Sequence, residues 1–196
     1  MRAGECVRSS REIDALPGVE RPLAVAGGTM LALLGSYIRH VVGADSGSLQ
    51  PMQTFPWQQA REFLASNGFA ARDAATIYWW NHVMLYGSDL GRIVVTNRSA
   101  AEALFSDLCR VTSGAGHVDL AAESFICLAL TGRRRLPPGV FLDLVESRLA
   151  TTGRVRGGGM EREVAESTEE QFWVSYHRTL LTATALAMAA QPLKRD

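Results

Sequence analysis

Lysine is almost missing from this sequence: Lys194 is the only one, and the other basic residues are arginines. Twenty acidic residues balance the twenty basic ones, so the formal net charge is zero. A neutral chain has no overall attraction to nucleic acid or to an anionic membrane, although a local basic patch stays open. The arginines supply planar, bidentate donors that suit interfaces.

Cysteine is also scarce. Cys6, Cys109 and Cys127 are an odd number, and their wide separation excludes a CxxC site and gives no disulfide framework. Cys109 and Cys127 lie in apolar helical patterns, which are typical of buried free thiols. Acidic residues precede the first apolar run and argue against a secretory signal. We therefore expect a reducing, intracellular compartment, with a mitochondrial or other organellar assembly left open.

The common catalytic motifs are missing as well. The four histidines form no HxH, HExxH or zinc-ligand spacing, and the chain has no Walker loop, Rossmann fingerprint or GxSxG elbow. His117 lies near Cys109, Ser113 and Asp119 in the sequence, but proximity along a chain is not triad geometry. We predict no catalytic residue, no cofactor and no metal site, and no small-molecule substrate is evident.

What the sequence does contain is helical periodicity over most of its length. Apolar residues recur three and four positions apart, and Gly, Pro and capping residues separate the segments. We predict an all-α fold, a single bundle-like or irregular array of six to seven antiparallel helices with short loops. The expected helices cover 23–42, 56–67, 71–86, 99–111, 119–132, 140–149 and 167–191. Leu90 to Thr96 is the one strand-like stretch, which we interpret as a linker or small edge element.

The chain divides, on its composition, into an arm and a body. Residues 43–53 are rich in Gly, Ser and Gln and predict a flexible connector. We therefore expect an N-terminal arm over 1–53, consisting of an apolar helix and this connector, and a helical body over 54–196. No segment recurs at a fixed period, so a repeat architecture is not predicted.

The arm carries the longest uncharged run, the seventeen residues from Pro22 to Ile38. A bilayer crossing needs about 20 apolar residues, so a core helix, a protein interface and a membrane contact all stay open. A helix without a polar face must be surrounded by its own domain, a partner or lipid. The candidate partner or membrane interface comprises Leu23, Val25, Met30, Leu31, Leu34, Tyr37 and Ile38.

Arginine clusters in two predicted loops. These residues, Arg133, Arg134, Arg135, Arg154 and Arg156, would form a basic patch if the loops shared one end of the bundle, and basic loops beside aromatics bind single-stranded nucleic acid. Charges in a turn at the C-terminal end of a helix also have a purely structural explanation, which we favour. Nucleic-acid contact is therefore the second interpretation of this chain.

The resulting functional prediction is a non-catalytic structural or adaptor subunit of a larger protein assembly, with membrane association left open. It rests on the abundance of apolar helical surface, because a chain of this size buries only a few helices completely. The alternative is an RNA-associated helical protein that uses the arginine loops. An enzyme acting on a small molecule is the third interpretation.

Overall fold

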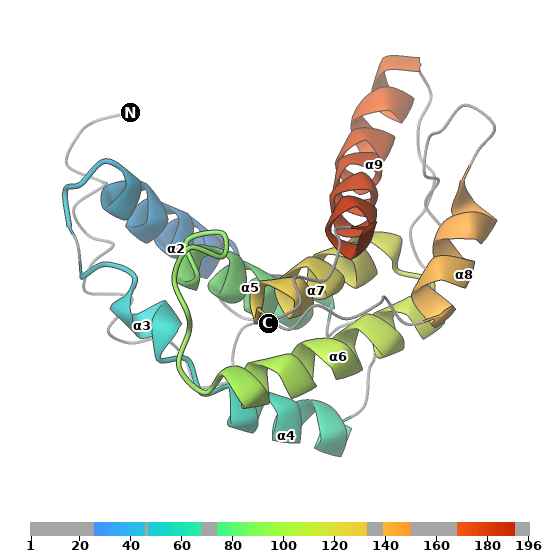
Figure 1. Ribbon diagram of the computed structural model, residues 1–196. Helices are drawn as coiled ribbons and strands as arrows, with labels where there is room; N and C mark the ends of the chain where they lie inside the picture. Colours follow the sequence, from blue (N-terminus) through green and yellow to red (C-terminus); the bar gives the residue numbers. More distant parts are fainter. Residues whose placement is uncertain (1–25, 46, 68–73, 133–138, 150–167, 191–196) are drawn as a thin grey trace. The chain divides into compact units, whose positions relative to one another are not determined.

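The computed structural model describes residues 26–45, 47–67, 74–132, 139–149 and 168–190. These residues form eight helices and no strand, so the all-α prediction is confirmed, with one helix more than expected (Figure 1). The chain divides into two compact units, Met1–Leu104 and Phe105–Asp196, and the division falls within one helix. Each unit is described by itself.

The first unit contains α2 (Ala26–Val41), α3 (Gln50–Gln53), α4 (Trp57–Asn67), α5 (Ala74–Gly87) and the start of α6 (Arg98–Gly114). Its centre is aromatic, because the indoles of α4 and α5 are completely enclosed. The Phe55 ring contacts Trp57 and Trp79 with centroid distances of 4.6 and 5.2 Å. Aromatic contacts in tilted and edge-to-face geometry add stability beyond the area that the rings bury.

Helix α3 lies in the segment that we expected to be a flexible connector. Leu49 and Met52 are buried, and α3 packs against α5. The hydroxyl of Ser48 donates to the carbonyl oxygen of Ser36 in α2 at 3.0 Å, which joins the connector to the preceding helix. Because most residues of this segment are polar, the sequence did not indicate that its two apolar residues belong to the core of the first unit.

Gly87, the last residue of α5, permits this close approach. A Cβ atom at Gly87 would lie 3.0 Å from the Cβ of Met52 and 3.1 Å from its carbonyl carbon. We predict that Gly87→Ala lowers the free energy of unfolding by about 1–3 kcal/mol, since overpacking must displace backbone here. Urea unfolding followed by circular dichroism measures the effect, and Gly114→Ala, where a Cβ meets nothing within 4 Å, is the control.

The segment between α5 and α6 is a series of turns and not a strand. Asp89, Leu90 and Asn97 adopt positive φ angles of 45°, 54° and 52°. Thr96 then donates to the carbonyl oxygen of Gln53 from both its amide, at 3.0 Å, and its hydroxyl, at 2.7 Å. These bonds hold the turn segment at the end of α3, so the strand-like composition of residues 90–96 does not produce a strand here.

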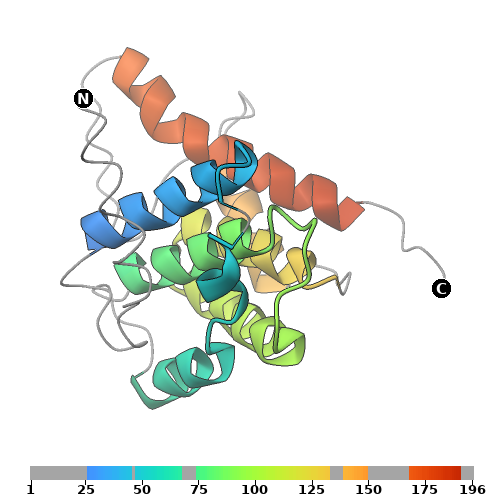
Figure 2. The same cartoon turned by 90° about the vertical axis from the view of Figure 1, so that its left-hand side faces the viewer.

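The second unit contains the remainder of α6, then α7 (Val118–Leu130), α8 (Gly139–Arg148) and α9 (Thr168–Ala190). Helix α7 is central, because α8 and α9 both pack against it (Figures 1 and 2). Its residues from Val118 to Leu128 are almost all buried. Phe125 of α7 stacks on Phe141 of α8 with ring centroids 5.8 Å apart. Trp79 and Trp80 are buried in the first unit, and Phe105, Phe125, Leu128 and Phe141 are buried in the second.

Candidate functional site

Helix α2 buries one side, which includes a serine, and leaves several aliphatic side chains exposed on the other side. Leu33 is completely buried and Ser36 nearly so, on the side that packs against α5. The neighbouring residue Leu34 is 39% exposed, and Leu31 is 71% exposed. The exposed aliphatic residues of this helix and its end form the apolar stripe: Leu31, Leu34, Ile38, Val41 and Val42.

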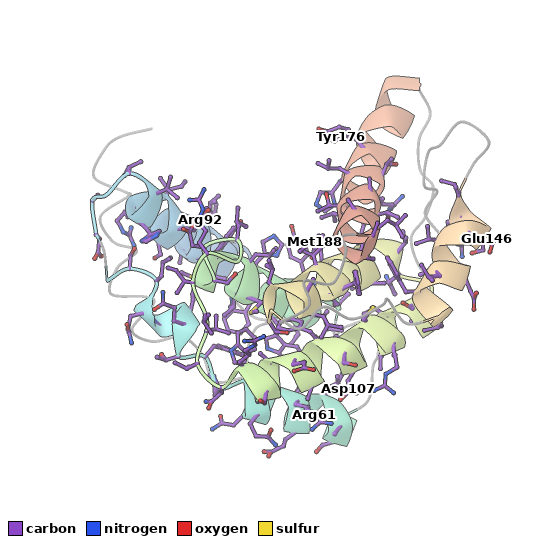
Figure 3. The ribbon with its side chains drawn as sticks, viewed as in Figure 1. Arg61, Arg92, Asp107, Glu146, Tyr176 and Met188 are labelled. Atoms are coloured by element: carbon purple, nitrogen blue, oxygen red, sulfur yellow. The ribbon has the colours of Figure 1, made fainter. Side chains whose placement is uncertain are left out.

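A carboxylate in the turn after α5 holds the polar residues of α2. The Tyr37 hydroxyl donates to Oδ1 of Asp89 at 3.2 Å, and Nε2 of His40 lies 3.8 Å from Oδ2. The guanidinium of Arg92, a residue marked in Figure 3, lies 3.5 Å from the same Oδ2. These contacts fix the rotation of α2 about its axis and therefore the direction in which the apolar stripe faces.

The Tyr37 ring adds a stacking contact to this attachment. It lies parallel to the ring of Tyr86 in α5, with centroids 4.9 Å apart and an interplanar angle of 14°. Desolvation and the hydrogen bond to Asp89 raise the pKa of Tyr37, so its hydroxyl stays a donor at neutral pH. Tyr37, which the sequence suggested as an interface residue, therefore connects α2 to α5 at the edge of the apolar stripe.

The other candidate residues from the sequence differ in where they lie. Leu31, Leu34 and Ile38 are exposed together. Met30 belongs to α2, whereas Leu23 and Val25 lie outside the described residues, as do the five arginines at 133–135, 154 and 156. Sequence reasoning missed Val41 and Val42, although Val41 continues the stripe seven residues after Leu34. No described helix combines the length and the hydropathy that a bilayer crossing requires.

A second group of ionisable side chains lies between α7 and α9. Nε of Arg178 lies 3.4 Å from Oδ2 of Asp119 in an ion pair, and His117 occupies the N-terminal cap position of α7. The His177 ring lies 3.9 Å from Asp119 through Nδ1 and 3.9 Å from Glu123 through Nε2. These histidine distances exceed hydrogen-bond reach, so the group is an ionic attachment of α9 to α7.

Burial shifts the pKa of Asp119, one of the two acids in this group. Desolvation raises the pKa of Asp119 above its ordinary value of 3.8, against the opposing effect of Arg178 and His177. The native state therefore holds a proton on this carboxyl at pH values where the unfolded chain has lost it. That contribution to stability is complete below pH 3.8 and is lost as the pH rises through the raised pKa.

We predict that Asp119→Asn removes this pH dependence. In the wild type, one extra bound proton lowers stability with rising pH by at most about 1.4 kcal/mol per pH unit within that window. The asparagine variant cannot titrate, so its stability should change less over the same pH range. Urea unfolding at a series of pH values compares the two proteins, and equal slopes would contradict the assignment.

The buried thiols of the second unit are unsuited to nucleophilic catalysis. Desolvation raises the pKa of Cys109 to about 12 and raises that of Cys127 as well. Because the thiolate is the reactive form, both thiols stay protonated and inert in the folded protein at neutral pH. Asp119, which lies near Cys109, Ser113 and His117 in the sequence, pairs with Arg178 of α9.

A family model described as "Domain of unknown function (DUF6895)" matches residues 42–187, which is most of the chain. The match covers α3 to α8 and most of α9, whereas α2 precedes it. No curated protein and no solved structure matches the chain.

Proposed function

Since the chain belongs to the family of domains of unknown function DUF6895, we propose its function from its own surface. The protein is a non-catalytic structural or adaptor subunit that joins a larger protein assembly through the apolar stripe of α2. Because α2 precedes the segment that the family model matches, the proposal concerns this chain and not the family as a whole.

The observation that carries the proposal is the composition of the stripe. Its five exposed residues are all aliphatic and lie along one side of α2 and at its C-terminal end. Scattered apolar residues are normal on a protein surface, but a contiguous patch marks a binding surface. A surface helix ordinarily directs polar residues to solvent, whereas α2 directs Ser36 inward.

The attachment of α2 also suits a docking element. Leu33, Ser36 and Tyr37 connect one side of the helix to its unit, so the other side is presented without rearrangement. A rigid, preformed surface loses little conformational entropy on binding, and this favours affinity. The contacts of Asp89 with Tyr37 and His40 thus support an interface helix that stays folded before its partner arrives.

Affinity purification of the full chain from its native source tests this function. Leu34→Glu and Ile38→Glu place a charge in the stripe without touching the buried side of α2. Val94→Glu is the matched control, because Val94 is an exposed aliphatic residue of the same unit outside α2. We expect the two stripe variants to lose the co-purifying chains that the wild type and the control retain. An identical set of chains in all four purifications would refute the proposal.

A further inference from the structure

We propose that the apolar stripe of α2 binds a second copy of this chain, with the two α2 helices antiparallel across a two-fold axis. The inference rests on the proposed function, because it names the partner of the same surface. Three features of the stripe lead to it: the spacing of its residues, the symmetry of that spacing, and the absence of charge at its borders.

The spacing is that of a helix–helix seam. Leu31, Leu34, Ile38 and Val41 follow one another at intervals of three, four and three residues. Apolar residues at alternating intervals of three and four form the contact line between two helices that pack at a shallow angle. Ser36, on the opposite side of the helix, is buried in the unit, so the seam is directed away from it.

The intervals read the same from either end of the helix, so the seam matches itself when one copy is reversed. In the antiparallel arrangement Leu31 meets Val41 of the second copy, and Leu34 meets Ile38. Each contact then occurs twice, as an isologous interface requires. Reversal also places the C-terminal end of each helix beside the N-terminal end of the other, where the helix dipoles attract.

The borders of the seam carry no charge. Gly35 and Val42 flank it on one side and Tyr37 on the other. The nearby cationic residues are engaged elsewhere: Arg39 donates to the Ser36 hydroxyl at 2.9 Å, and His40 faces Asp89. A like-charged border would oppose association of identical surfaces. The neutral border of α2 sets no such barrier against a second copy.

Sedimentation of the purified full chain over a micromolar concentration series tests the inference. We expect the wild type and Val94→Glu to convert from monomer to dimer with rising concentration. Leu34→Glu and Ile38→Glu should weaken dimerisation by at least about a hundredfold, because each dimer would bury uncompensated carboxylates. A monomeric wild type throughout, or a dimer that both glutamate variants preserve, would overturn the inference.

Disulfide trapping tests the orientation. A Leu34→Cys chain and an Ile38→Cys chain, each also carrying Cys6→Ser and each with a different tag, are mixed and oxidised. The antiparallel arrangement predicts that disulfides between unlike chains dominate. Disulfides mainly between like chains would indicate parallel helices and overturn the proposed geometry.

The two proposals fail in different ways. If the wild type sediments as a monomer while its glutamate variants lose co-purifying chains, another protein occupies the stripe, and only the second copy is excluded. If the chain dimerises through α2 while the variants keep every other co-purifying chain, the adaptor function of the stripe fails and the dimer stands.

Discussion

Phe125→Ala is expected to lower the free energy of unfolding by about 3–5 kcal/mol, the range for large-to-small changes at enclosed aromatic sites. Phe125 is almost completely buried in α7 and stacks on Phe141. Removing its ring leaves a cavity in the helix against which both α8 and α9 pack. Urea unfolding followed by circular dichroism measures the loss.

The control for this substitution lies on α8. Leu142 follows Phe141 in the sequence but is 43% exposed. Leu142→Ala should therefore change stability by less than about 0.5 kcal/mol, as exposed positions usually do. A cost below about 1 kcal/mol for Phe125→Ala would show that α7 is not the centre of the second unit.

The second large effect separates two adjacent leucines of α2. Leu33→Ala should lower the free energy of unfolding by about 2–5 kcal/mol, because it empties a completely buried site beside α5. Leu34→Ala removes the same atoms from the exposed stripe and should cost less than about 0.5 kcal/mol. Both changes alter helix propensity equally, so the difference between them reports burial alone.

These two variants are compared by urea unfolding at low protein concentration, where association does not contribute to stability. Equal costs at the two positions would mean that α2 is not attached through the side that contains Leu33. A larger cost at Leu34 than at Leu33 would reverse the assignment of the two faces.

Most helices were predictable from local patterns. Pro56 immediately precedes α4, and the apolar repeats of α6 and α9 place those helices within a few residues of their observed limits. Helix α3 was not predictable in this way. Its burial depends on the space beside Gly87, a residue more than thirty positions later, and nothing in the composition of 43–53 reports that space.

The candidate interface was predictable only in part. The absence of charge from Pro22 to Ile38 identified Leu31, Leu34 and Ile38, but Arg39 and His40 concealed the continuation to Val41. Those two side chains turn aside because Ser36 and Asp89 engage them, and Asp89 lies about fifty residues away along the chain. The ion pair of Asp119 was also not predictable from local sequence, because its partner Arg178 belongs to a helix far along the chain.

The two buried thiols can be used to measure how often the second unit opens. Cys109 lies in α6 and Cys127 in α7, and neither is accessible while those helices stay packed. The rate at which each thiol reacts with a small alkylating reagent therefore measures how often its surroundings open. Equal rates would identify one cooperative opening of the unit, whereas faster labelling of Cys109 would identify a local separation of α6 that leaves α7 enclosed.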